Sequence, residues 1–237
     1  MKLQGIFVDT TTPFDHAGEL YRVKIEHNIG KWNQTTVAGY VVGGFAGEGA
    51  LLSSEEKQNL WRIAAAAAGP GKILIAGIQA QGVHDAAAQI KQAAALGYTA
   101  ALVDTHHDKE RELFFYRALA DRASIPIATG LCRSESTLWT AFTQGADAAA
   151  LPLASAAPYA CIAVWEAYRT REEEAGLDWQ SRITPAAELI KNRLSVPGLK
   201  HAMDLNGYYG GPPRLPWTSP TPPERQEIEQ AFADLKS

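Results

Sequence analysis

The sequence has few cysteines and no long apolar run, and both absences narrow its class. Its 237 residues include only two cysteines, Cys132 and Cys161, and no Cys-x-x-Cys pair. Neither a zinc site nor a disulfide framework is therefore expected. No apolar stretch approaches the ~18 residues that a membrane span requires, and the N-terminus lacks a signal-peptide layout. We therefore expect a cytoplasmic protein with no membrane partner.

The sequence also lacks an excess of charge of one sign. Its net charge is −4, with acidic and basic residues interspersed, so it offers no basic surface for nucleic acid. The hydrophobic content of 46% is enough for a sizeable core. The length suits one domain of about 200–250 residues, as α/β barrels often are. No low-complexity tract or short-period repeat interrupts the chain.

Short, almost wholly apolar segments alternate with amphipathic ones along most of the chain. The apolar segments are typical of strands that are covered on both faces, as in a parallel sheet. The expected strands are 5–10, 39–45, 73–78, 100–105, 125–129 and 148–153. The expected helices between and after them are 18–35, 54–68, 83–96, 110–123, 135–144 and 158–175. Repeated β/α units predict an α/β fold, either a barrel or an open doubly wound sheet.

The tail follows a different pattern from about residue 184. A helix is followed by a proline-rich stretch at 212–223, which excludes helix there. From Glu224 onward a last amphipathic helix is expected, with Ile228, Phe232 and Leu235 on one face. We therefore divide the chain into a barrel-like domain at 1–180 and a helical appendage at 181–237.

Several motifs resemble, in order and spacing, those of the dihydrodipicolinate synthase / N-acetylneuraminate lyase family. GYVVGGFAGEGALLSSEEK at 39–57 resembles the strand-2 segment of that family. TTPF at 11–14 resembles its Thr-Pro-Phe, and GYYGGPPRLP at 207–216 its C-terminal turn. Members are (β/α)8-barrel aldolases that hold a 2-oxo acid as a Schiff base on a lysine. The resemblance therefore implies a carbon–carbon lyase acting on pyruvate or another 2-oxo acid, without a metal or other cofactor.

The chain departs from the family pattern after residues 125–130. IPIATG resembles the start of strand 5, but the Tyr-Asn-x-Pro continuation is absent. The following residues resemble the strand-7 to strand-8 region instead. Roughly one and a half to two of the eight β/α units are then missing, among them the strand with the Schiff-base lysine. We expect an incomplete TIM-barrel-like sheet of about six strands. Its mouth should be lined by strand ends near Thr10, Phe45, Ile78, Thr105 and Thr129.

The resemblance implies a substrate-binding turn after the second strand. Its residues are Thr12, Phe45, Ala46, Gly47 and Glu48. Phe45 and Ala46 stand where the family has two hydroxyl residues, so two side-chain donors to a carboxylate are lost. Backbone N–H groups at Ala46 and Gly47 can still form an anion-binding turn. In the alternative interpretation the glycines only permit a tight turn, and Glu48 is a structural cap or ion pair.

The loop after the fourth expected strand holds the candidate catalytic residues, His107 and Lys109. Lys109 is on the mouth side, and His106 and His107 replace a tyrosine pair of the family, where imidazole could transfer protons near neutral pH. Together, Asp104, His106, His107 and Asp108 could instead ligate a metal ion. A third interpretation is a solvated or subunit-contact loop.

Three classes of function therefore remain. The first is an aldolase-type lyase with a degenerate site. The second is a catalytically inactive relative that binds a small carboxylate or serves as an interaction module, and the third is a metal-dependent lyase. A barrel with missing strands also has two unpaired edges, so a homo-oligomer, a dimer or higher, is expected. The expected seam is Thr129–Arg133, with the His106–His107 loop as a second candidate.

Overall fold

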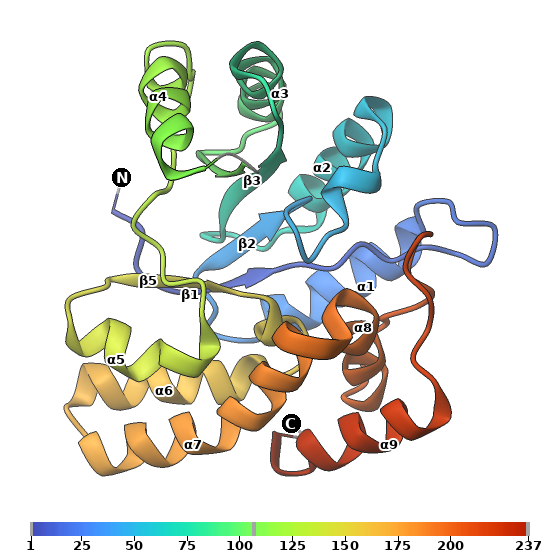
Figure 1. Cartoon of the computed structure of the whole chain (residues 1–237), viewed down its shortest axis with the longest axis vertical. Coiled ribbons are helices and arrows are strands. Elements are labelled where there is room, and N and C mark those ends of the chain that lie inside the picture. Colours follow the sequence, from blue (N-terminus) through green and yellow to red (C-terminus); the bar gives the residue numbers. More distant parts are fainter. Residues whose placement is uncertain (1, 106–107, 236–237) are drawn as a thin grey trace.

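A computed structural model describes residues 2–105 and 108–235 and contains a single curled sheet (Figure 1). Five strands pair in parallel in the order β4-β3-β2-β1-β5. The strands are β1 (Gly5–Asp9), β2 (Gly39–Val42), β3 (Ile73–Gln79), β4 (Ala100–Asp104) and β5 (Ala148–Leu151). The prediction of an incomplete, TIM-barrel-like parallel sheet is therefore confirmed.

Helices cover the convex face of this sheet and form the C-terminal appendage (Figure 1). Those of the β/α units are α1 (Arg22–Asn33), α2 (Ser54–Ala67), α3 (Val83–Ala95), α4 (Lys109–Ala120), α5 (Leu138–Thr143) and α6 (Pro158–Thr170). The appendage contains α7 (Glu173–Leu189), α8 (Ser195–Leu205) and α9 (Pro222–Ala231). None of the helices within residues 2–105 and 108–235 has both the length and the apolar character that crossing a lipid bilayer requires.

The appendage follows the sequence expectation with two differences. α7 continues across the expected domain boundary at 180/181 and contains Pro185. α9 begins at Pro222 rather than at Glu224. Proline is tolerated in the first turn of a helix, because an N–H at that position would have no acceptor within the helix. Ile228, Phe232 and Leu235 are all buried, as their common face predicts.

Two apolar clusters alternate along the strands and define the two faces of the sheet. Ile6 and Val8 of β1 pack with helix residues on the outer face. Phe7 of β1, Val41 of β2 and Ile75 of β3 form a separate inner cluster. Because side chains alternate along a strand, the next inward positions after these lie at the carboxyl ends, at the mouth of the barrel.

The expected strand at 125–129 does not form. The residues around it instead make isolated bridges to the two edge strands, β4 and β5. Ile127 bridges Ala101 of β4, and Cys132 bridges Ala149 of β5. Ala128 donates to the Ala101 carbonyl and Cys132 to that of Ala148, at 2.8 and 2.9 Å. Proline has no N–H to donate, so Pro126 interrupts any longer ladder. The segment 126–132 thus spans the gap between both edge strands, and the expectation of two wholly unpaired edges is wrong.

We expect the close approach of β3 to the turn after β2 to require glycine at position 77. A Cβ there would lie 2.1 Å from the Gly44 nitrogen, so Gly77→Ala should destabilise the fold by roughly 1–3 kcal/mol. Gly30→Ala in α1 is the matched control, because no atom lies within 4 Å of its Cβ. That substitution should be neutral or stabilising by roughly 0.5–1 kcal/mol. Urea unfolding of both variants measures the difference, and equal stabilities would contradict the expectation.

Candidate active site

A cavity of about 260 Å³ opens at the carboxyl ends of β1, β2 and β5, under the appendage. We call it the mouth cavity. Its apolar lining includes Phe45, Leu153, Ile190, Val196 and Leu199. Its polar lining is formed by Asp9, Arg133, Glu135, Lys191 and Ser195. A largely apolar cavity with a few converging polar groups at a barrel mouth is the usual setting of a small-molecule site.

Asp9 is the most unusual of these residues. It follows Phe7 on the inner face of β1, and only 2% of it is exposed. Its Oδ1 atom is buried and has no hydrogen-bond partner among the described residues. Burial raises the pKa of this carboxyl from 3.8 to about 7, although Arg133 acts in the opposite direction. Near neutral pH the group can therefore both accept and donate a proton.

Arg133 and Glu135 stand beside Asp9 on the segment that leads to α5. The Arg133 guanidinium pairs with both carboxylate oxygens of Asp104, at the end of β4. Glu135 accepts a hydrogen bond of 2.9 Å from the backbone N–H of Leu153, and burial raises the pKa of its carboxyl. The floor of the cavity is thus rich in carboxyl groups, with one guanidinium among them.

Phe45 and Ala46 line the cavity, as expected for a substrate-binding turn. Ala46 is buried, whereas half of Phe45 is exposed. Neither side chain can donate a hydrogen bond. Two of the five expected substrate-binding residues therefore meet the cavity and contribute only apolar surface.

The other three expected residues hold the turn and the appendage together. Thr12 donates a 2.6 Å hydrogen bond to the Gly47 carbonyl. Glu48 adopts a left-handed conformation with φ 56° and pairs with Lys200 of α8 at 2.5 Å. Lys200 is 1% exposed and also donates to the Pro212 carbonyl. Burial lowers the pKa of Lys200, while Glu48 favours its charged form.

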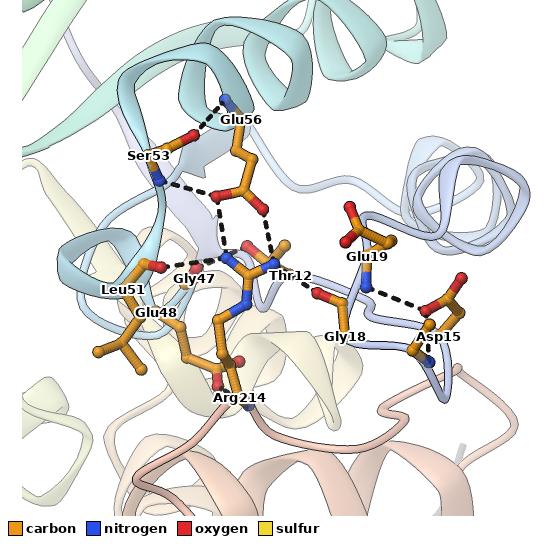
Figure 2. A network of polar contacts seen from close by, with 11 residues as sticks. Thr12, Asp15, Gly18, Glu19, Gly47, Glu48, Leu51, Ser53, Glu56 and Arg214 are labelled. Atoms are coloured by element: carbon orange, nitrogen blue, oxygen red, sulfur yellow. Dashed lines mark hydrogen bonds and ion pairs between the residues drawn. The ribbon is translucent and has the colours of Figure 1, made fainter.

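Arg214 completes this connection, as Figure 2 shows. Its backbone N–H donates to Glu48 at 2.7 Å, and its guanidinium pairs with Glu56 at the start of α2. The same guanidinium donates to the carbonyls of Leu51 and Gly18. We call Glu48, Lys200, Arg214 and Glu56 the tail clamp. It fixes the appendage on the turn after β2.

The expected catalytic loop is only partly covered by the description. His106 and His107 lie outside the described residues. Lys109 begins α4, but its side chain also lies outside the description. Of the other two metal-ligand candidates, Asp104 pairs with Arg133, and Asp108 caps α4 by accepting from the Arg111 N–H. Among residues 2–105 and 108–235, no group of three or more His, Cys, Asp or Glu side chains could hold a metal ion.

The expected strand ends line the mouth only in part. Phe45 lines the cavity, whereas Ile78 packs in the outer cluster among the helices. Thr10 donates its hydroxyl to the Val41 carbonyl. The sequence did carry a signal for Asp9. It is the only charged residue of β1, which is otherwise apolar, and it points to the same face of the strand as Phe7. No local pattern marks the remaining polar lining residues.

The comparisons with known proteins agree with this fold. A model of the dihydrodipicolinate synthetase family matches residues 2–107. A 4-hydroxy-tetrahydrodipicolinate synthase of an Exiguobacterium species is 23% identical over 270 residues, covering 90% of this chain and 91% of the relative. An N-acetylneuraminate lyase of Rhizobium meliloti is 32% identical over 131 residues, covering 54% of this chain and 44% of the relative.

Solved structures show the same architecture. The dihydrodipicolinate synthase DapA-2 of Bacillus anthracis has a TM-score of 0.90 at 16% identity, covering 100% of both chains. An N-acetylneuraminate lyase of Mycoplasma synoviae has a TM-score of 0.82 at 18% identity, covering 97% of both. The fold is thus that of a TIM-barrel protein, shortened to five strands. Together with the sequence matches, these structures show that this chain is similar to proteins of the dihydrodipicolinate synthetase family, whose model matches its N-terminal part.

We expect the buried Asp9 carboxyl to make the stability of the protein depend on pH. Its pKa is raised in the folded state, so its contribution is fully present below about pH 4 and is lost as the pH rises to about 7. Asp9→Asn should abolish this loss, which amounts to several kcal/mol because one pKa unit is about 1.4 kcal/mol. Asp121→Asn at the exposed end of α4 should not. Urea unfolding from pH 4 to 8 makes the comparison. An unchanged slope in the Asp9 variant would contradict the assignment.

Proposed function

We propose that this protein acts on a small 2-oxo acid, such as pyruvate, held in the mouth cavity without a Schiff base. In this proposal Asp9 transfers the proton at the carbon next to the carbonyl. The observation that carries it is a buried carboxyl with an unpartnered oxygen, facing a small cavity at a barrel mouth. Similarity to the dihydrodipicolinate synthetase family supports the reaction class.

The proton transfer is simple to balance. The Asp9 carboxylate takes a proton from C3 of pyruvate, and the electron pair of that C–H bond moves to the carbonyl oxygen as an enolate. Arg133 lines the same cavity and has further N–H groups beyond those that bind Asp104, so it can donate to this oxygen. Return of the proton regenerates pyruvate. If C3 of the enolate instead adds to the carbonyl carbon of an aldehyde, a carbon–carbon bond forms, and the proton held by Asp9 goes to the alkoxide oxygen of the aldehyde. The reverse of these steps is the lyase reaction.

The positions of the lysines argue against a Schiff base. Among the lysines whose side chains are described, only Lys191 lines the mouth cavity. It is exposed to solvent, whereas a nucleophilic lysine is activated by removal from water. Lys57 and Lys72 are bonded to groups outside the mouth, and Lys200 is held by Glu48. The side chain of Lys109 is not described, so it stays in the test below.

The inactive relative and the metal-dependent lyase remain as alternative outcomes of the exchange experiment described below. An inactive relative would bind the oxo acid without exchanging its protons. A metal-dependent lyase would need His106 and His107, since Asp104 and Asp108 already have protein partners. The free oxygen of Asp9 favours the proton-transfer proposal over both.

We expect the protein to exchange the methyl protons of pyruvate with deuterium from D₂O, as followed by ¹H NMR. Asp9→Asn should slow this exchange by about 100-fold or more, because positioned acid–base groups contribute about 10²–10⁴-fold. The rate in the wild-type protein should increase with pH up to about 7, as the carboxylate form is populated. Asp121→Asn, a distant surface change, should exchange like the wild type.

The result that contradicts the proposal is equally clear. Exchange that persists in Asp9→Asn would exclude this role of the carboxyl. A mass increase after borohydride reduction in pyruvate would show a Schiff base, and Lys109→Met and Lys191→Met would then identify the reacting amine. Binding of pyruvate without exchange would support the inactive relative instead.

We further propose that the protein forms a homodimer through the outer face of α4. Leu113 and Phe114 are 51% and 62% exposed there, although both are large and apolar. Glu110 and Arg117 flank them at equal distances along the helix, and both are exposed. In a two-fold antiparallel contact centred on Leu113 and Phe114, each Glu110 would face the Arg117 of the second copy. The face is thus complementary to itself.

Sedimentation velocity tests this dimer. The wild type should be dimeric at micromolar concentration, and Phe114→Glu should be monomeric because it buries two like charges near the axis. Leu215→Glu is the matched control, since Leu215 is 77% exposed on the tail and away from α4. A monomeric wild type, or a Phe114→Glu variant that still dimerises, would contradict the proposal.

A further inference from the structure

The junction between α7 and α8 has an irregular backbone directly over the mouth cavity. Residues Ile190–Leu194 form a π-helical turn, and Ser195 follows with φ 48° and ψ −146°. This conformation is unfavourable for any residue with a side chain. Strain and π-helical turns of this kind are frequent at functional sites. Ile190, Lys191, Ser195 and Val196, on both sides of the break, line the cavity.

The break gives α8 a new N-terminus at the cavity. No side chain caps this end. The Ser195 N–H donates to the Ile190 carbonyl and Pro197 has no N–H, so the first turn can offer an anion at most the N–H groups of Val196 and Gly198. Such an end carries a partial positive charge that favours anions. The exposed Lys191 adds a full positive charge beside it, and the Ser195 hydroxyl adds a donor.

A second and independent feature points to a ligand in this cavity. The Asp9 side chain lies at the floor, is 2% exposed and has an oxygen without a hydrogen-bond partner. Unpartnered buried polar atoms are rare, because each one costs free energy that a partner would recover. The cavity thus has a positive rim formed by the appendage and a carboxyl floor formed by the barrel.

The side chains of the turn after β2 supply no hydrogen-bond donor to this cavity. The two cavity residues of the turn, Phe45 and Ala46, have no polar side-chain atoms. The side chain of Glu48 is turned away to Lys200 and the Arg214 backbone. The side-chain donors for an anion in this cavity are therefore those of Lys191, Ser195 and Arg133, and Arg133 is already paired with Asp104.

We propose that the carboxylate of the 2-oxo acid binds at the N-terminus of α8, between Lys191 and the Ser195 hydroxyl, with its carbonyl end toward Asp9. The proposal rests on the proposed function and adds the orientation and the charge class of the substrate. Glu135 and Asp104 stand near Asp9, so a second carboxylate at that end would meet like charges. The substrates are therefore 2-oxo monocarboxylates rather than dicarboxylates.

Calorimetric titration of the full chain tests this orientation with three probes: pyruvate, its neutral amide pyruvamide, and 2-oxoglutarate. Lys191→Met should weaken pyruvate binding about tenfold, because it removes a charge-assisted hydrogen bond at a site that is open to solvent. Ser195→Gly should weaken it several-fold. Pyruvamide binding should be unchanged in both variants. 2-Oxoglutarate should bind the wild type more weakly than pyruvate does.

Two controls make the outcomes distinct. Arg193→Gln removes the same charge from the same turn, but Arg193 pairs with Glu227 and does not line the cavity, so pyruvate should bind unchanged. Ser195→Gly permits the positive φ, so its thermal stability should equal or exceed that of the wild type. If the wild type binds pyruvate and both site variants bind it equally well, the inference is overturned while the proposed function stands. If the wild type binds no pyruvate, the proposed function itself fails.

Discussion

The ion pair between Glu48 and Lys200 joins the two parts of the chain on which the site depends. Glu48 ends the glycine turn after β2, and Lys200 lies one helical turn and a half into α8. Both side chains are almost wholly buried, at 0% and 1% exposure. Removing one partner of such a pair leaves an unpaired buried charge, which costs about 3–5 kcal/mol. The pair therefore fixes where α8 stands over the mouth, and so where its first residues meet the cavity.

The shortened barrel solves a second problem, which is how to close a sheet with fewer strands. A barrel becomes narrower as strands are removed, and its interior must then be filled by smaller side chains. The inner cluster meets this requirement with Ala100, Ala148 and Ala150, around the single aromatic ring of Phe7. The segment 126–132 completes the circuit by bonding to β4 at one end and β5 at the other. The mouth keeps the place it has in a full barrel, while its walls now come partly from the appendage.

Local sequence features predicted most of the fold. The capping box of Ser53 and Glu56 marks the start of α2, and Gly97, with a positive φ, follows the end of α3. Both motifs involve only residues that are close in the sequence, so they can be recognised without knowledge of the fold. The crossing of 126–132 depends instead on the positions of two distant strands. Its apolar residues look like a strand, and only the fold decides that they form isolated bridges.

The site was predicted less completely for the same reason. Phe45 and Ala46 could be placed at the mouth because their turn directly follows a strand. Lys191 and Ser195 reach the cavity from the appendage, through a backbone break that no sequence pattern announces. Asp9 could have been noticed as a charge in the inner register of an apolar strand, yet its importance depends on burial, which only the assembled barrel creates.

We infer that the mouth cavity holds a 2-oxo acid by non-covalent contacts that the appendage provides. A crystal structure of the protein with pyruvate would show these contacts. We predict pyruvate in the mouth cavity, with its carboxylate against Lys191 and Ser195, its carbonyl end toward Asp9, and no bond to any lysine. Pyruvate linked covalently to a lysine, or bound with its carboxylate on the turn of Phe45 and Ala46, would contradict the account.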